Sequence, residues 1–492
     1  MSLPFKSPQT LHPSSFGDGF LWGTASSAYQ DDVQIMKDIG FNACRLSISW
    51  SRILPRGKIS GGVNEKGIKF YHDLIDELLS NGITPFVTLF HWDLPQALEN
   101  EYMGFLSTQI VNDFHDYAKL CFSLYGSKVK NWITLNEAVM YCCCGYVDGI
   151  HAPGRGPASS STPSGRGPAS SLTPPNSSST NSLAEGLEIF TGIRLPRCQA
   201  TEPAGNGGSS ENGDPGREPY IVARNLLLAH AAAVKLYKDN FQEIQKGQIG
   251  IVLVSNWFLP WDADSEEDEA TVRRALDFML GWFMEPLIRG DYPQNMIDYV
   301  DEDRLPSLKD PDCPYEVKGS YDFIGINYYT AQYVLNSPKP PGEKPSYKTD
   351  QQLKTTYYNK NNVPIGEKSG ADWLYIYPKG IGELLKWMAE NYGNDRDLVI
   401  YITENDASGG DMRTNYHHDH LLNLLNAMTN NIMKKNHVEV KGYFVWSLLD
   451  NYEWGDGYKT RFGLVYVDYK DGHLVRHWKK SATWFKKFFE RG

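Results

Sequence analysis

Short apolar runs bounded by polar or turn residues recur along the whole chain. Runs of this length with β-branched and aromatic residues are typical of buried strands. Eight of them are predicted to be strands, over residues 20–25, 43–49, 84–90, 131–135, 249–255, 321–327, 398–403 and 442–447. The pattern therefore predicts a protein with one strand every few tens of residues.

Most of these runs are separated by long segments in which apolar residues recur with a helical period. One such stripe consists of Ile68, Tyr71, Leu74, Ile75, Leu78 and Leu79, and a helix is predicted there that ends before Asn81-Gly82. Eight alternations of strand and helix favour α/β architecture with a single (β/α)8 TIM barrel spanning residues 1–492. An open doubly wound sheet is the less favoured alternative.

Residues 154–217 depart from this alternation. They are rich in Gly, Ser, Pro and Asn, and Gly154-Arg-Gly-Pro-Ala-Ser-Ser returns as Gly165-Arg-Gly-Pro-Ala-Ser-Ser. Such a composition buries little apolar surface. We therefore predict a flexible, low-complexity insertion after the fourth strand, without a catalytic role.

Two glutamates follow predicted strands directly. Glu137 comes after the fourth strand and Glu404 after the seventh. In a barrel the loops after the strands form the active site, so both carboxyl groups are expected at one face, across the barrel mouth from each other. An isolated glutamate at a strand end is most often a solvated surface group. A facing pair is the arrangement that cleaves glycosidic bonds.

Composition narrows the function further. The net charge is −11, from 48 basic and 59 acidic residues, which excludes the usual electrostatic signature of nucleic-acid binding. No apolar stretch reaches the roughly 18 residues of a membrane span, and the N-terminus lacks a signal-peptide core, so a cytoplasmic location is expected. Aromatic residues make up 13%, which suits sugar rings, although core packing explains most of them.

Neither the cysteines nor the histidine cluster predicts a metal site. The chain has seven cysteines, which we expect to be free or buried thiols, and three adjacent residues from Cys142 to Cys144 cannot all face one ion. His417 and His420 have helical spacing but no third and fourth ligand, so the start of a surface helix is the preferred interpretation. No cofactor is predicted.

Seven motifs in one order resemble glycoside hydrolase family 1, the retaining β-glucosidases, and especially its plant members. They are Phe20-Leu-Trp-Gly-Thr-Ala-Ser-Ser-Ala-Tyr-Gln30, Arg45-Leu-Ser-Ile-Ser-Trp-Ser-Arg52, Leu89-Phe-His-Trp-Asp-Leu-Pro-Gln96, Thr134-Leu-Asn-Glu137, Gly325-Ile-Asn-Tyr-Tyr329, Ile402-Thr-Glu-Asn405 and Trp446-Ser-Leu-Leu-Asp-Asn-Tyr-Glu-Trp454. Further segments look most like plant glucosidases of monoterpene indole alkaloids, such as those for strictosidine or raucaffricine.

The resemblance implies a role for each matching residue. Glu404 is expected to be the nucleophile, supported by Arg45 and Tyr329, and Glu137 the acid and base. The resemblance also implies a set of glucose-binding residues: Gln30, His91, Asn136, Asn327, Tyr329, Trp446, Glu453 and Trp454. Trp373 and Phe462 match positions that shape the aglycone side, where ordinary packing is an equal alternative.

Two connections are shorter than the family pattern. Gln30 runs directly into Asp31, and the segment after Glu404 reaches Arg413 within a few residues. Asp406 stands where the family has Gly and Ala138 where it has Pro, so Asp406 adds negative charge near the expected nucleophile. A missing loop beside Gln30 would leave the sugar site more open.

The sequence therefore predicts a retaining β-glucosidase that hydrolyses the glucoside of a plant specialised metabolite, with an alkaloid glucoside as one candidate. A catalytically impaired carbohydrate-binding relative and a transglucosidase that uses the same glutamates are the alternatives. The expected partner is a small-molecule β-glucoside, with neither nucleic acid nor membrane, and a homo-oligomer is compatible with the sequence.

Overall fold

The computed structural model describes residues 11–25, 30–156, 197–198, 213–470 and 472–491, without the side chains of residues 30 and 31. Eight parallel strands close into a barrel in the order β1-β13-β12-β7-β5-β4-β3-β2. Their bounds are β1 Leu21–Ala25, β2 Ala43–Ser47, β3 Thr84–Phe90, β4 Asn131–Asn136, β5 Gln248–Val254, β7 Phe323–Asn327, β12 Leu398–Glu404 and β13 Val438–Trp446. All eight predicted strands are confirmed, and the closed barrel replaces the open-sheet alternative.

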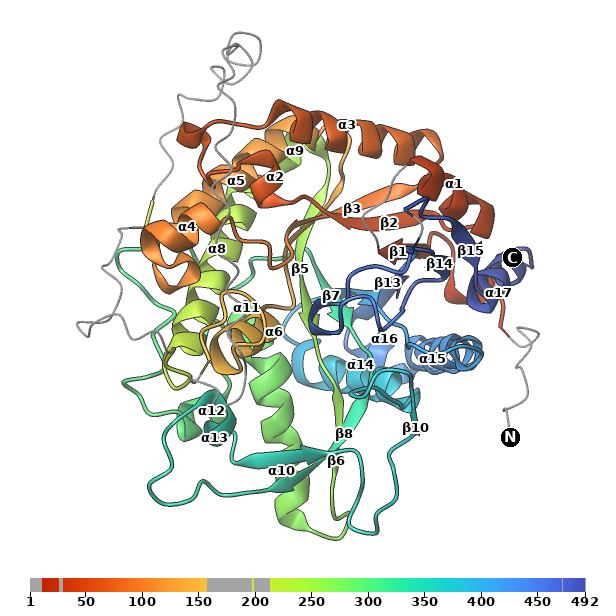
Figure 1. Ribbon diagram of the computed structural model, residues 1–492. Helices are drawn as coiled ribbons and strands as arrows, with labels where there is room; N and C mark the ends of the chain where they lie inside the picture. The colour runs from red at the N-terminus through yellow and green to blue at the C-terminus, as the bar shows by residue number, and fades with distance from the viewer. Residues whose placement is uncertain (1–10, 26–29, 157–196, 199–212, 471, 492) are drawn as a thin grey trace.

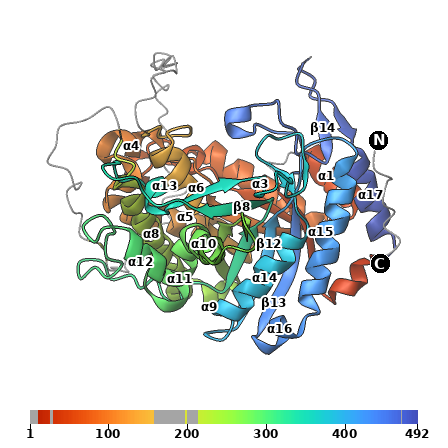
Figure 2. The ribbon, with the colours of Figure 1, turned by 90° about the horizontal axis from the view of Figure 1, so that it is seen from below.

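Helices lie around these strands, as Figure 1 shows. The larger ones are α1 Gln30–Ile39, α3 Glu65–Ser80, α5 Gln109–Tyr125, α8 Glu218–Asn240, α10 Glu266–Leu276, α11 Trp282–Arg289, α14 Lys379–Tyr392, α15 Met412–Met428 and α17 Lys480–Phe489. The predicted stripe on α3 is buried except for Leu79 at its end. Figure 2 shows α14 and α15 side by side on the outside of the barrel.

Shorter helices occupy the connections: α2 Trp50–Ile53, α4 Gln96–Tyr102, α6 Ala138–Cys142, α9 Gln242–Gln245, α12 Gln294–Tyr299, α13 Tyr347–Asp350 and α16 Asn431–Lys435.

Helix α10, one of the larger helices, shows how the local sequence determines where a helix starts. Ser265 accepts a hydrogen bond from the backbone N–H of Asp268, four acidic residues fill the first turn, and Arg273 and Arg274 lie in the last. The cap satisfies a backbone N–H group that has no partner within the helix. The acidic residues at the start and the basic residues at the end interact favourably with the helix dipole.

The interior of the barrel is filled by an aromatic layer. Phe86 on β3, Phe323 on β7, Tyr401 on β12 and Phe444 on β13 form this layer, with ring centroids 4.9–6.2 Å apart. A side chain at Gly23 would approach the Phe444 ring to 2.2 Å, so only glycine leaves room for the ring. Because this layer closes the barrel, a pocket can open only at the strand ends.

The last helix seals the barrel where β1 meets β13. Trp22 on β1 contacts Phe488 at 5.2 Å and Phe489 at 5.6 Å, and Phe41 contacts Phe485 at 5.5 Å. Helices α1 and α17 accordingly lie next to each other in Figure 1. Burial of these rings ties the beginning of the described chain to its end.

Three small sheets lie outside the barrel and were not predicted. They comprise β6 Trp257–Pro260 with β8 Ala331–Asn336 and β9 Leu353–Thr356, β10 Glu367–Lys368 with β11 Tyr375–Ile376, and β14 Val465–Val467 with β15 Arg476–Trp478. Their strands are short and half exposed, so their apolar pattern is weak. They belong to the loops that follow barrel strands.

The cysteine prediction needs a correction. Cys198 and Cys313 form a disulfide across 115 residues, whereas Cys44, Cys121 and the run from Cys142 to Cys144 are free. The fold brings these two cysteines together, and the spacing of cysteines along the sequence does not reveal which of them meet. Cys198 lies within the predicted insertion, most of which (157–196 and 199–212) lies outside the described residues. Within the described part of the chain, no helix is long and apolar enough to cross a membrane.

Candidate active site

Backbone geometry presents the two glutamates at the same end of the barrel. Glu137 directly follows β4 and has the left-handed backbone angles φ 45 and ψ 54, which cost a non-glycine residue of the order of 1 kcal/mol. Glu404 ends β12, where the register with β7 shifts between Ile402 and Glu404. Two strands, β7 and β5, separate β12 from β4 on the shorter way round the barrel, so the glutamates are not diametrically opposed.

Both carboxylate oxygens of Glu404 are held by donors. The Arg45 guanidinium forms an ion pair with Oε1, and the Tyr329 hydroxyl donates to Oε2 over 2.6 Å. Arg45 is 2% exposed and Glu404 4% exposed. Two donors on different oxygens hold this buried carboxylate in one orientation.

Glu137 has a different environment. Its Oε1 accepts a hydrogen bond of 2.6 Å from the side-chain amide of Asn327, and no cation forms an ion pair with it among the described residues. Burial, and then the negative charge of Glu404, raise the pKa of Glu137 to about 8. Glu137 therefore retains its proton at neutral pH.

Asn136 connects Arg45 to His91. Its Oδ1 accepts from Arg45 Nη2 over 2.5 Å, and its Nδ2 donates to His91 Nε2 over 3.1 Å. Burial lowers the pKa of His91 to about 3, so the imidazole is neutral and accepts this hydrogen bond. The backbone carbonyl of Asn136 is held by the indole of Trp92 at 2.8 Å.

A carboxyl group and two indoles complete this side. The Trp446 indole donates to Glu453 Oε1 over 3.3 Å, and burial raises the pKa of Glu453 to about 8. Trp454 contacts Trp92 at 4.5 Å and His91 at 6.0 Å between ring centroids. Indole faces beside hydroxyl-binding polar groups are suited to a pyranose ring.

These groups line one cavity of about 460 Å³. The predicted residues on its wall are His91, Asn136, Glu137, Tyr329, Trp373, Glu404, Trp446, Glu453, Trp454 and Phe462. The sequence analysis missed further wall residues: Trp92, Met140, Cys144, Ile150, His151, Val254, Asn256, Met279, Thr330, Tyr357, Gly455 and Asp456. Cys144 and Met279 lie on π-helical turns, Cys143–Val147 and Asp277–Gly281, an irregularity frequent at functional sites that the sequence pattern does not reveal.

Among the described residues, two predicted site residues do not line this cavity. Asn327 is fully buried and supports Glu137, with its own Oδ1 held by the Thr403 hydroxyl at 2.7 Å. Arg45 lies behind Glu404. The side chain of Gln30 lies outside the described residues, so its sugar contact stays a prediction.

A second cavity of about 280 Å³ adjoins the first. It is lined by the ends of β1, β2 and β3, including Ala25 and Arg45, and shares His91, Trp446 and Trp454 with the larger cavity. Residues 26–29 of the connection beside Gln30 lie outside the described residues, so the expectation of a more open sugar site stays a prediction.

The histidine cluster and Asp406 are buried. His417 and His420 are fully buried on α15, so the predicted surface helix start is wrong: the first turns of α15 pack under the barrel mouth. Asp406 forms an ion pair with Arg413. No group of three metal-ligating side chains occurs among the described residues.

A parallel barrel with an acid and an oriented carboxylate in a sugar-sized cavity defines a glycoside hydrolase. The family model for glycosyl hydrolase family 1 matches residues 29–164 and 188–492, and the chain belongs to this family. It is 45% identical over 493 residues to β-glucosidase 12 of Oryza sativa subsp. japonica, covering 97% of this chain and 85% of that protein.

Raucaffricine-O-β-D-glucosidase of Rauvolfia serpentina is also 45% identical, over 94% of this chain and 81% of that protein. Among solved structures, the rice Os3BGlu6 β-glucosidase superposes with a TM-score of 0.80 at 35% identity, covering 97% of this chain and 99% of that chain. The protein is thus a family 1 β-glucosidase of plant type, acting on glucosides.

Proposed function

We propose that the protein hydrolyses its glucoside by double displacement, with Glu404 as nucleophile and Glu137 as acid and base. In the first step a Glu404 oxygen attacks the anomeric carbon and the bond to the aglycone oxygen breaks. The Glu137 proton moves to that oxygen. In the second step Glu137 takes a proton from water, the water oxygen attacks the same carbon, and the ester to Glu404 breaks.

The unequal environments of the two carboxyl groups carry this proposal. Glu137 holds a proton at neutral pH because burial and the adjacent negative charge raise its pKa to about 8. Arg45 and Tyr329 hold Glu404 in one orientation through both oxygens. When Glu404 becomes an ester, its negative charge disappears, the pKa of Glu137 falls, and Glu137 is then able to act as the base.

We further propose a bulky, largely apolar aglycone. The outer wall of the cavity presents Met140, Ile150, Met279, Tyr357 and Trp373. Ile150 is 67% exposed and Trp373 43% exposed, so these side chains gain burial when an aglycone covers them. An alkaloid glucoside fits this chemistry, and the similarity to the raucaffricine enzyme supports the same class.

The test is hydrolysis by the purified protein of an aryl β-glucoside and of a panel that includes bulky alkaloid glucosides. The parent is expected to release phenol, and β-glucose is expected to be the first anomer seen by NMR. Glu404→Gln removes the nucleophile and is expected to abolish release. Glucose binding without turnover by the parent would instead favour a carbohydrate-binding relative, and transfer to an added alcohol in preference to water would favour a transglucosidase.

A further inference from the structure

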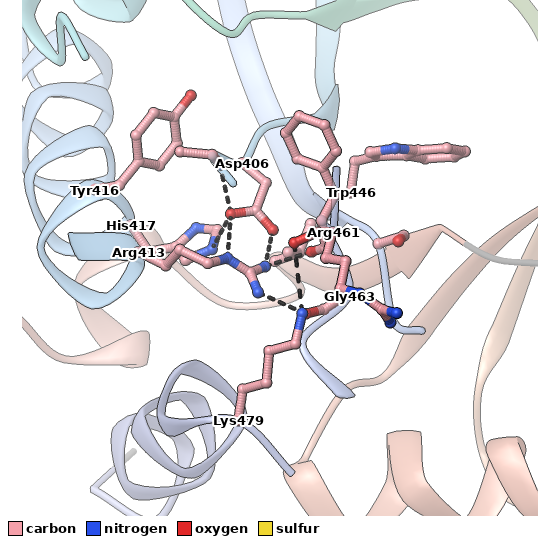
Figure 3. A network of polar contacts seen from close by, with 12 residues as sticks. Asp406, Arg413, Tyr416, His417, Trp446, Arg461, Gly463 and Lys479 are labelled. Atoms are coloured by element: carbon pink, nitrogen blue, oxygen red, sulfur yellow. Dashed lines mark hydrogen bonds and ion pairs between the residues drawn. The ribbon is translucent and has the colours of Figure 1, made fainter. Parts of the chain in front are cut away.

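A buried charge cluster lies beneath the nucleophile and takes no part in the proposed chemistry. Asp406, two residues after Glu404, is fully buried, and Arg413 in the first turn of α15 is 1% exposed. Arg413 Nε donates to Asp406 Oδ1 over 3.1 Å, and Nη2 contacts Oδ2. Figure 3 shows the two side chains facing each other, with His417 Nε2 3.1 Å from the same carboxylate.

Arg413 also reaches a loop far away in the sequence. Nη1 donates to the carbonyl of Gly463 over 2.5 Å, and Nη2 donates to the carbonyl of Phe462. A single guanidinium therefore joins Asp406, two residues beyond the nucleophile, to the two consecutive carbonyls of Phe462 and Gly463. Asp406 fixes the orientation of the guanidinium that makes this connection.

The same loop is fastened from its other side by Asp450. The backbone N–H of Gly463 donates to Asp450 Oδ1 over 3.0 Å, Lys479 Nζ donates to that oxygen over 2.6 Å, and Arg461 Nη1 donates to Oδ2 over 3.1 Å. The carboxylates of Asp406 and Asp450 thus hold the loop between them through complementary cations and backbone groups. Figure 3 shows Lys479, Arg461 and Gly463 converging there.

The side chain that this loop carries is part of the cavity wall. Phe462 is 3% exposed and lines the cavity. Its ring contacts Tyr329 at 6.2 Å, the residue that donates to Glu404, and Trp373 at 6.2 Å. The position of the Phe462 backbone therefore determines where the aromatic wall stands relative to the nucleophile.

We propose that Asp406 is a positioning residue for aglycone specificity, acting through Arg413 on the loop that carries Phe462. This inference rests on the proposed function. Loss of the Asp406 charge leaves Arg413 buried without its counterion, which is strongly unfavourable. Arg413 then turns toward other oxygens, its hydrogen bonds to the loop are lost, and Phe462 moves. The value of kcat/KM then falls for substrates whose aglycone contacts Phe462, and it falls less for substrates without an aglycone ring.

The test compares Asp406→Asn with the parent on two substrates, an aryl β-glucoside and β-glucosyl fluoride, the second of which lacks an aglycone ring. In Asp406→Asn, kcat/KM for the aryl glucoside divided by kcat/KM for the fluoride is expected to be at least about tenfold lower than in the parent. A change of this size corresponds to the loss of one apolar contact in a specificity pocket. Active-site titration removes any contribution of unfolded protein.

A matched control is available in a second buried ion pair. Asp350 is 1% exposed and pairs with Arg304 through two hydrogen bonds of 2.7 and 2.8 Å, away from the cavity wall. Asp350→Asn makes the same chemical change, and it is expected to lower stability without changing the substrate ratio. An equal ratio in the parent, Asp406→Asn and Asp350→Asn would overturn the proposal.

A second readout does not depend on turnover. Hydrogen exchange of the peptide covering residues 461–465 is expected to be faster in Asp406→Asn and unchanged in Asp350→Asn, and no acceleration would also overturn the proposal. If Asp406→Asn does not fold, the double variant Asp406→Asn, Arg413→Met removes both charges together and carries the same two expectations. An inactive parent would contradict the proposed function, whereas the exchange measurement would still decide the role of Asp406.

Discussion

The side-chain amide of Asn327 donates a hydrogen bond of 2.6 Å to Oε1 of Glu137. Asn327 is also the register partner of Glu404 on the neighbouring strand. One residue thus connects Glu137 to the strand end that carries Glu404. A single change at this position therefore affects the geometry between the two carboxyl groups.

Asn327→Ala is expected to move the alkaline limb of the kcat/KM profile to higher pH. The amide favours the charged form of Glu137 and lowers its pKa, so its removal raises that pKa, and Glu137 keeps its proton to higher pH. We also expect a loss of rate of about tenfold or more because Glu137 is less well positioned. Thr403→Val, which frees Asn327 without removing it, should shift the limb less, and an unmoved limb in Asn327→Ala would contradict this role.

Glu137→Gln is expected to discriminate between leaving groups. A poor leaving group, such as an alkyl alcohol, needs the proton of Glu137 and should lose about 10² to 10⁴ in the first chemical step. A dinitrophenyl glucoside leaves without a proton, so its first step should change little, and slow deglycosylation should appear as a burst. Pre-steady-state release of the two alcohols measures this, and equal losses for both would argue against an acid at position 137.

The same substitution is expected to stabilise the fold in a pH-dependent way. The folded-state pKa of Glu137, about 8, lies above the ordinary value of 4.5, so between these values the folded state retains a proton that the unfolded state has lost. Parent stability therefore falls as pH rises through this window, by up to about 1.4 kcal/mol per pH unit. Unfolding free energies should favour Glu137→Gln more at pH 8 than at pH 5, and a constant difference would show that the pKa is not raised.

The disulfide between Cys198 and Cys313 can be tested by counting free thiols before and after reduction. Alkylation of the unfolded, unreduced protein should label five cysteines, and alkylation after reduction should label all seven. Since the bond closes a loop of more than 100 residues, its loss in Cys198→Ser is expected to lower unfolding free energy by about 2–5 kcal/mol. Mass spectrometry reads the count, and seven labels without reduction would exclude the bond.

Trp373→Ala is expected to weaken the binding of bulky aryl glucosides. The indole is 43% exposed on the cavity wall and meets the Tyr329 ring edge-on at 5.7 Å. Its removal should raise KM about tenfold with little change in kcat, because the contact is made in the ground state and transition state alike. Methyl glucoside serves as the comparison substrate, and equal effects on both would indicate that Trp373 only packs the wall.

The barrel strands and the positions of Glu137 and Glu404 at strand ends were predictable because their signals are local. A short apolar run of strand length indicates a buried strand, and Glu137 and Glu404 are recognisable because they stand where two such runs end. The register shift at Glu404 and the left-handed backbone of Glu137 refine these positions without changing them. The small sheets were missed because their short, half-exposed strands carry little periodicity.

Other properties depend on which distant residues meet. The raised pKa of Glu137 comes from its burial and from the charge of Glu404, which lies 267 positions later in the chain (404 − 137). Asp406 appeared as a charge beside the nucleophile, yet Arg413 turns it toward the Phe462 loop. The pairing of Cys198 with Cys313 has the same origin. Periodicity and motif identify the chemical groups, whereas burial, charge state and partner are properties of the assembled barrel, since each depends on the distance between segments that the chain order keeps apart.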